Sequence, residues 1–340
     1  MIKNIIVTFI LCVIIPVVTS ANACSRFTYT AKDNTVITGR SMDWTEDLHT
    51  DIWAFPAGIA RVGDTSANGV KWVSKYGSVI ASAYNRGAAD GINTQGLNAN
   101  LLYLATADYG TPQPSHKNLS VFNWVQYVLD NYATVDEAVK GLSQSQFNMM
   151  APQLPNGAQA SLHLAITDSS GDNAVFEHIN GKLVIHHGKQ YTVMTNEPVY
   201  DKQLALTDYW SKLNGVFLPG TSEPEDRFVR AHYYLSTAPA STVEQKSVSI
   251  VFSIIRNLSA PISVAVTDRP NVASTLWRSV ADLKNKVYFF ESTDRPNIFW
   301  VDMNLLDLKA GAPVKKLPLA NNEIYAAEVS KNFVDSKTMN

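Results

Sequence analysis

Residues 21–44 read ANACSRFTYTAKDNTVITGRSMDW, and they decide how the chain begins to fold. The segments CSRFTYTA and VITGRSMDW are rich in β-branched and aromatic residues, and the turn signal KDNT separates them. Two such runs joined by a short polar connection are typical of a β-hairpin. Cys24 stands directly before the first predicted strand and directly after Ala-Asn-Ala. The hairpin therefore begins at a cysteine that follows a motif typical of leader cleavage.

The residues before this hairpin have the three parts of a secretory signal peptide. Lys3 supplies a positive charge, Ile5–Val18 is almost entirely apolar, and Ala21–Ala23 is an A-x-A cleavage site. We expect residues 1–23 to be removed and the protein to be exported, with the periplasm as its compartment. An uncleaved anchor would need about 20 apolar residues. A lipoprotein leader is the stronger alternative, although it requires a large aliphatic residue where this chain has Ala21.

Composition limits what the chain can do. It has 340 residues, 46% of them hydrophobic and 17% charged, so it can bury a large core. Its net charge is −2, and losing the leader's one lysine makes it −3; we therefore expect no nucleic-acid partner and no stable membrane association. The two cysteines are Cys12, in the leader, and Cys24. The mature chain then has one thiol and no internal disulfide, which leaves pairing with another chain, lipidation or reactivity as its use.

Strand patterns occupy both ends of the mature chain, and helix signals lie between them. Beyond the hairpin, strands are expected at 77–85, at 88–104 with a turn at Asp90-Gly91, at 161–187 as a three-stranded meander, and at 191–198, 275–280, 286–292 and 298–306. A helix is expected at 121–132 with Ser120 as its cap, and another at 138–142 behind a capping box of Thr134 and Glu137. A third is expected to begin at Pro224 and continue through 225–236, and a fourth to begin at a capping box of Ser241 and Glu244. With no linker and no repeat, this order predicts one α+β domain over 24–340.

A cysteine at position one of a mature chain has unusual chemistry. A free thiol titrates near ~8.5 and is mostly protonated at neutral pH. The α-amine of the same residue titrates near ~7.7–8.0, so it can act as a base beside its own side chain. Without the cleavage site, a lone cysteine such as Cys24 would more often be an inert core residue. With the cleavage site, one residue supplies both nucleophile and base.

The chain resembles the choloylglycine hydrolase family, which consists of N-terminal nucleophile hydrolases that cut linear amides. The likeness runs through nearly the whole mature chain and follows the family's order. Cys24 opens a strand, GRSMDW supplies Arg40 and Asp43, TNEP supplies Asn196, and RFVR supplies Arg227. Four spaced matches in order are specific, whereas any one of them alone is weak. The resemblance implies an α+β fold, a four-layer αββα sandwich of two antiparallel sheets between helical layers.

The resemblance also implies a catalytic role for each matched residue. Cys24 would be the nucleophile, Asp43 would orient its amine, and Arg40 would stabilise the thiolate by charge. Asn196 would donate an N–H to the oxyanion, and Arg227 would belong to the charged network behind the site. Taken singly, the same residues would be ordinary ion pairs or a turn asparagine before a proline.

Two aromatic residues bear on the substrate. The family's second oxyanion donor is a backbone N–H near residues 96–104, and its position falls at Tyr103; bile salt hydrolases often have asparagine there, whereas penicillin V acylases commonly have tyrosine. Trp44 faces either the acyl pocket or the core. Penicillin V is therefore the first substrate we expect. Conjugated bile salts and N-acyl homoserine lactones are alternatives, because an apolar pocket discriminates only modestly between apolar groups.

The sequence also contains features that could indicate a metal site, a papain-like site or a non-catalytic protein. His178, His186 and His187 could suggest a metal, but adjacent strand residues point to opposite faces, so we expect no metal and no cofactor. A papain-like site would need a CGSCW-like context, which ACSRFTY lacks. A lipid-anchored, non-catalytic binding protein is the alternative from another class. The family resemblance also implies a homotetramer that takes a small-molecule amide as substrate.

Overall fold

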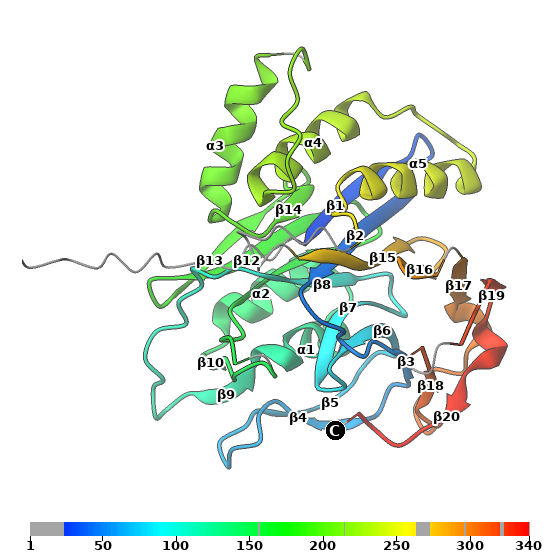
Figure 1. Ribbon diagram of the computed structural model, residues 1–340. Helices are drawn as coiled ribbons and strands as arrows, with labels where there is room; N and C mark the ends of the chain where they lie inside the picture. Colours follow the sequence, from blue (N-terminus) through cyan, green and yellow to red (C-terminus); the bar gives the residue numbers. More distant parts are fainter. Residues whose placement is uncertain are drawn as a thin grey trace, which may run out of the picture.

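Two β-sheets packed between helical layers form the framework of the protein (Figure 1). The computed structural model describes residues 24–155, 157–213, 215–262, 273–295, 297–319 and 323–339. The predicted signal peptide, residues 1–23, lies outside these ranges.

The first sheet contains the predicted N-terminal hairpin near one edge. Its seven strands lie in the order β14 (Val193–Thr195), β1 (Ser25–Thr30), β2 (Val36–Trp44), β15 (Ser274–Asp282), β16 (Val287–Ser292), β17 (Ile298–Asp302) and β19 (Ala327–Glu328). All neighbours are antiparallel except β17 and β19, which pair in parallel at the far edge.

The second sheet is larger and antiparallel throughout. Its nine strands lie in the order β13 (Lys182–His187), β12 (Asn173–Ile179), β11 (Leu162–Thr167), β8 (Asn98–Tyr103), β7 (Gly87–Asn93), β6 (Ser78–Ala83), β3 (Ile52–Phe55), β18 (Lys315–Leu317) and β20 (Val334–Asp335). Two small ribbons complete the strands of the described residues, formed by β4 (Ala60–Val62) with β5 (Lys71–Val73) and by β9 (Lys117–Ser120) with β10 (Phe147–Met150).

Helices cover the outer face of each sheet. The first sheet packs against α4 (Pro224–Thr237) and α5 (Glu244–Asn257), and α3 (Tyr200–Ser211) packs on α4. The second sheet packs against α1 (Trp124–Asn131) and α2 (Val135–Gln144). The short 3₁₀ turns are η1 (Val121–Asn123), η2 (Met303–Leu305) and η3 (Ser330–Asn332). Figure 1 shows the resulting order of helices, sheet, sheet and helices, which confirms the predicted four-layer α+β sandwich.

The β1–β2 hairpin shows how alternate residues are divided between the two faces of the first sheet. Phe27 and Gly39 pair across the hairpin and face α5. A Cβ on Gly39 would lie 2.7 Å from Val251 Cγ1, so the helix can pack this closely only on a glycine. Arg26 points the other way, into the space between the sheets, where it donates to Asn100 Oδ1 at 3.1 Å. The hairpin thus contributes an apolar face to the helices and a polar face to the interior.

Hydrogen bonds as well as apolar contacts join the two sheets. Asp90, on β7, is 1% exposed and accepts hydrogen bonds from Asn100 Nδ2 at 2.5 Å and from Tyr288 OH at 2.7 Å. Ser279, on β15, also donates to it. A buried carboxylate needs such partners, because an unpaired one would carry a large desolvation cost. The bonds from Ser279 and Tyr288 connect β7 to two strands of the opposite sheet, β15 and β16.

Some of the helix predictions are confirmed and others are wrong. Thr134 caps α2 by accepting from Glu137 N, as predicted. Ser120 accepts from Phe122 N but caps the 3₁₀ turn η1, whereas the N-cap of α1 is Asn123, without a side-chain hydrogen bond. The Ser241/Glu244 capping box is wrong: α5 begins at Glu244, and the Ser241 hydroxyl accepts instead from Val243 N in the preceding turn. Helix α3 was not predicted, because its apolar residues do not follow a clear amphipathic period.

The predicted strands form, but one turn is wrong and the last strand is shorter than predicted: β17 ends at Asp302, and Met303–Leu305 forms η2. The meander over 161–187 forms β11, β12 and β13, and the three late segments form β15, β16 and β17. The expected turn at Asp90-Gly91 is wrong, because both residues lie inside β7 and the chain reverses after Asn93. Gly91 serves close packing there: a Cβ would meet Ile80 Cγ2 at 2.5 Å. The Asp90-Gly91 pair therefore lies inside a strand, where the aspartate accepts hydrogen bonds from the opposite sheet.

Candidate active site

Cys24 lies at the start of β1, beside the end of β2. Ser25 pairs with Ser41, and this register brings the cysteine alongside Met42 and Asp43. Cys24 Sγ accepts the Asp43 N–H at 3.5 Å and lies 3.8 Å from Met42 Sδ. The side chain is buried, with 2% exposed. Burial raises the pKa of the Cys24 thiol, so in this environment the thiol needs a base to become a nucleophile.

Asp43 is fully buried and has three polar neighbours. Its Oδ1 accepts from Thr275 Oγ1 at 2.5 Å, its Oδ2 accepts from Ser41 Oγ at 3.4 Å, and Arg227 Nη1 lies 3.9 Å from Oδ2. Burial raises the pKa of Asp43 from 3.8 to about 6, although the Arg227 charge and the Thr275 hydrogen bond act in the opposite direction. The carboxylate is therefore ionised at neutral pH and protonates under mildly acidic conditions.

Arg227 connects the separate parts of the site. It comes from the first turn of α4 and is fully buried. Its Nη1 donates to the Cys24 carbonyl at 2.6 Å and to Ser25 Oγ at 2.5 Å, while Nη2 donates to Asn196 Oδ1 at 3.3 Å and Nε to the Ser222 carbonyl at 2.9 Å. One guanidinium thus fixes the residue that bears the thiol and the asparagine that follows β14, because its planar fork donates in fixed directions.

The Asn196 side chain is oriented by its two partners. Because Arg227 occupies its Oδ1, its amide NH₂ faces the opposite side, where Nδ2 donates to the Tyr103 carbonyl at 2.7 Å. One N–H of that group is left for a ligand. Leu104 N donates to the Ser161 carbonyl across the β8–β11 edge, so the preceding residue, Tyr103, directs its own N–H and C=O away from β11. The Tyr103 N–H therefore points to the same side as Asn196.

Arg40 lies beside the thiol without bonding to it. Its Nη2 donates to the Leu101 carbonyl at 3.0 Å and contacts Met42 Sδ at 3.5 Å, and the guanidinium lies 4.4 Å from the Trp277 ring centroid. Met42 Sδ is thus in contact with both Arg40 and Cys24. The Arg40 charge opposes the effect of burial on the pKa of the Cys24 thiol. Its influence on the thiol is electrostatic.

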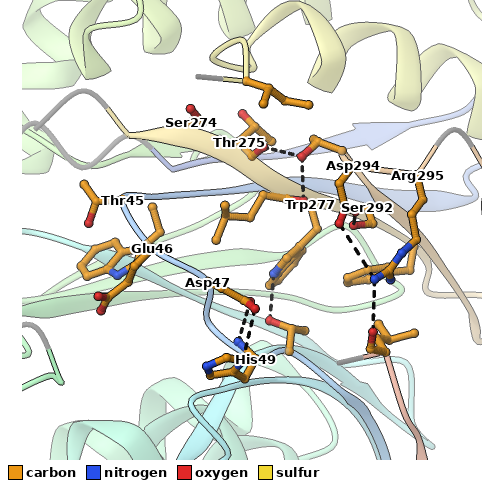
Figure 2. Close-up of a pocket in the computed structure, with 17 residues that line it drawn as sticks. Thr45, Glu46, Asp47, His49, Ser274, Thr275, Trp277, Ser292, Asp294 and Arg295 are labelled. Atoms are coloured by element: carbon orange, nitrogen blue, oxygen red, sulfur yellow. Dashed lines mark hydrogen bonds and ion pairs between the residues drawn. The ribbon is translucent and has the colours of Figure 1, made fainter. Parts of the chain in front are cut away.

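Trp44 follows Asp43 in the chain, is largely buried and lines a cavity of about 450 Å³. Its indole N–H donates to Tyr84 OH at 2.7 Å, and its ring makes an edge contact with Tyr103 at a centroid distance of 5.7 Å. Figure 2 shows the cavity between the segment that follows β2 and the strand β15, which contributes Thr275 and Trp277. Trp44 therefore packs against the half-buried Tyr103 and also lines this cavity, while its role in binding the acyl group stays a prediction.

The sequence of this chain matches a known family over the region that forms the site. The sequence model of the family described as linear amide C-N hydrolases, choloylglycine hydrolase family, matches residues 24–316. The chain belongs to this family. It is accordingly an enzyme that hydrolyses linear amide bonds, and the family match begins at Cys24. The alternative of a non-catalytic binding protein is set aside.

Relatives of the family agree in sequence and in fold. A penicillin V acylase of Pectobacterium atrosepticum is 45% identical over 337 residues, which cover 92% of this chain and 90% of the relative. The solved structure of a penicillin V acylase from Agrobacterium tumefaciens is 47% identical, covers 93% of this chain and 98% of its own, and superposes with a TM-score of 0.87. A bile salt hydrolase/transferase of Clostridium perfringens is 24% identical over 83% of this chain and 92% of the relative. The fold is that of the acylase structures.

Two neighbours of the site residues, Thr275 and Met42, were not predicted from the sequence. Thr275, from β15, bonds to Asp43, and Met42 lies between Arg40 and Cys24. Met42 could have been suspected from its place inside GRSMDW. Thr275 could not, because only the β2–β15 register places it opposite Asp43.

The histidines are distributed as expected from strand alternation. The ring centroids of His186 and Tyr200 are 4.9 Å apart, whereas His187 Nε2 lies 2.7 Å from Asp172 Oδ2. The two adjacent side chains therefore point to different neighbours. Within the described ranges, no group of three metal-ligating side chains comes together. A search of the same residues finds no helix with the length and apolar character needed to cross a membrane.

Proposed function

We propose that the mature chain is a penicillin V acylase, which splits penicillin V into 6-aminopenicillanate and phenoxyacetate. The observation that carries the proposal is the Arg227 cluster, in which one buried guanidinium contacts Cys24 and Asn196 and lies 3.9 Å from Asp43. These residues are the ones matched to the family's catalytic motifs. The two relatives at 45% and 47% identity are both described as penicillin V acylases.

The nucleophile is created by removal of residues 1–23. In the full-length chain the Cys24 nitrogen is an amide and has no basic lone pair. Cleavage converts it to an amine that titrates near ~7.7–8.0 and can take the thiol proton. Because burial raises the pKa of the Cys24 thiol, this internal base is needed at neutral pH. Asp43, ionised above about pH 6, favours the protonated amine.

The oxyanion would be held between Asn196 and Tyr103. Attack of the thiolate on the amide carbonyl forms a C–S bond and places negative charge on the carbonyl oxygen. The free N–H of Asn196 Nδ2 and the Tyr103 backbone N–H point to one side of the site and can both donate to it. Such donors stabilise charge that develops in the transition state, and loss of one has cost ~2.7–4 kcal/mol in another enzyme.

The two halves of the substrate leave in sequence. The protonated Cys24 amine gives its proton to the departing nitrogen, the C–N bond breaks, and 6-aminopenicillanate leaves. The phenoxyacetyl group remains on Cys24 as a thioester. Water, deprotonated by the same amine, attacks the thioester, the C–S bond breaks, and phenoxyacetate is released with the thiol restored.

Substrate choice is proposed from the aromatic lining. Tyr103 and Trp44 make an edge contact beside the site and present apolar rings where an aryl acyl group could pack. The test is a panel of penicillin V, penicillin G, glycocholate and N-acyl homoserine lactones, with chromatography of both products. We expect the highest kcat/KM for penicillin V. A protein with a proven free N-terminal Cys24 that releases no 6-aminopenicillanate would refute the assignment, and a preference for glycocholate or a homoserine lactone would identify the alternative activity.

Export and maturation are part of the same proposal. We infer that residues 1–23 direct the chain to the periplasm and that residues 24–340 remain as one catalytic unit. The intact mass of the purified protein tests this directly. A mass that starts at Cys24 is expected, whereas a glyceride-modified cysteine would show a lipoprotein.

A homotetramer is proposed on the basis of exposed apolar side chains near the end of α3 and in the segment that joins α3 to α4. Tyr209, Val216 and Phe217 have 62%, 74% and 71% of their surface exposed. Large apolar side chains left exposed in this way are typical of a protein interface. Light scattering should give four times the mass of the mature chain, and Phe217→Ser should shift the distribution to smaller species. A monomer with the wild-type sequence would contradict the proposal.

A further inference from the structure

Gln203 is a buried side chain of α3 that reaches back to the turn carrying Asn196. It is fully buried. Its Nε2 donates to the Asn196 carbonyl at 3.2 Å and to the Pro198 carbonyl at 2.6 Å. Its Oε1 accepts from Thr195 N at 3.4 Å and from Thr195 Oγ1 at 3.2 Å. A single side-chain amide therefore contacts the backbone on both sides of Asn196.

The helix that carries Gln203 is itself fixed to the sheet. Tyr200 OH donates to the Val193 carbonyl at 2.8 Å, and Tyr200 N donates to the buried Glu177 carboxylate at 3.0 Å. Because β14 is the edge strand of the first sheet, its outer backbone groups would otherwise lack partners. Side chains of α3 provide these partners, and further hydrogen bonds hold the helix that carries Gln203 against β14 and β12.

The position of this turn matters because Asn196 has little freedom to compensate. Its side-chain oxygen is bonded to Arg227 and its nitrogen to the Tyr103 carbonyl, so a shift of its backbone would move the remaining N–H relative to the Cys24 thiol. Misplacement of a catalytic group by about 1 Å can cost on the order of a hundredfold in rate. The contacts that hold the backbone of this turn in place therefore influence the rate of the reaction.

We propose that Gln203 is a positioning residue for the oxyanion site: its amide sets the backbone of Asn196, and through it the direction of the Asn196 N–H. The inference rests on the proposed function of Asn196 as oxyanion donor. A primary amide suits this place because it can donate twice and accept twice at once. Methionine has nearly the same length without those bonds, and glutamate keeps the acceptor while losing both donors.

The test compares mature Gln203→Met with a matched control, Gln126→Met. Gln126 is also buried in a helix and donates twice, to Ser78 Oγ at 3.1 Å and to Asp130 Oδ1 at 2.7 Å, but it lies in the opposite helical layer. For each variant, kcat and KM are measured with penicillin V, or with whichever amide of the panel the wild type hydrolyses. The rate of Cys24 alkylation by iodoacetamide is measured in parallel, because alkylation needs the thiolate but forms no oxyanion.

We expect Gln203→Met to lower kcat by about ten- to a hundredfold, with KM and the alkylation rate within about twofold of wild type. Gln126→Met should retain the wild-type kcat. An unchanged kcat in Gln203→Met, or a parallel loss of kcat and alkylation, would overturn the proposal. If the methionine variant does not fold, Gln203→Glu takes its place with the same expectations. A wild type that hydrolyses another amide but not penicillin V refutes the proposed substrate and leaves the comparison of variants intact.

Discussion

Replacement of Thr275 by valine should move the acid limb of the pH–rate profile. Valine keeps the shape of threonine but removes the hydroxyl that donates to Asp43 Oδ1 at 2.5 Å. A hydrogen bond to a charged group contributes about 1.5–3 kcal/mol, and one pKa unit corresponds to about 1.4 kcal/mol. Because this bond favours the ionised form, its loss should raise the pKa of Asp43 from about 6 by about one to two units, to about 7–8.

The assay is kcat/KM as a function of pH for the mature enzyme. The acid limb of the wild type should contain two ionisations, that of the Cys24 amine near ~7.7–8.0 and that of Asp43 near about 6, so the fall of log(kcat/KM) should steepen below about pH 6. In the valine variant this steepening should begin one to two pH units higher, and the rate should approach that of the wild type in alkaline solution. Stability should also fall by about 1–3 kcal/mol, because the Ala260 N–H donates to the same hydroxyl at 2.9 Å and would lose its partner.

Thr275→Ser is the matched control, since it retains the hydroxyl and should retain the wild-type acid limb. The reasoning is refuted if the valine variant has the same limb as the wild type. It is also refuted if the serine and valine variants shift equally, because the change would then come from packing rather than from the hydrogen bond.

Three further predictions concern the remaining site residues. Cys24→Ser should lose nearly all turnover while circular dichroism shows that it remains folded, and full activity would exclude Cys24 as the nucleophile. One additional residue ahead of Cys24 should also abolish turnover, because it turns the amine into an amide, and full activity there would exclude the amine as the base. Asn196→Ala should lower kcat by about 10²–10³-fold, and a loss confined to KM would show that the side chain does not stabilise the oxyanion. Asp43→Asn tests the coupling between proton binding and the free energy of unfolding. The carboxyl binds its proton more tightly in the folded state, so wild-type stability should fall as the pH rises from about 4 to about 6. In urea unfolding the asparagine variant should therefore gain about 2–3 kcal/mol relative to wild type between pH 4 and pH 7.5, and a pH-independent difference would show that burial does not raise the pKa of Asp43.

Local sequence signals identified the elements whose pattern is contained in a few neighbouring residues. The hairpin of β1 and β2, the meander of β11 to β13 and the Thr134 cap formed where they were predicted. Helix α3 was missed, because packing on α4 and hydrogen bonds to β14 stabilise it in place of an amphipathic pattern of its own. Asp90-Gly91 was mistaken for a turn, because the partners that stabilise the aspartate lie on strands far away in the sequence.

The sequence by itself predicted Cys24 as the nucleophile, because a cysteine behind an A-x-A site would begin a mature chain with its own amine, and its match over residues 24–316 assigns the chain to its family. Only the tertiary structure decided how these parts act together. Asp43 and its partner Thr275 are 232 positions apart, and they meet because β2 and β15 are neighbours in one register. The raised pKa of Asp43 has the same origin, since burial arises from packing across both sheets and their helices, which no local pattern encodes.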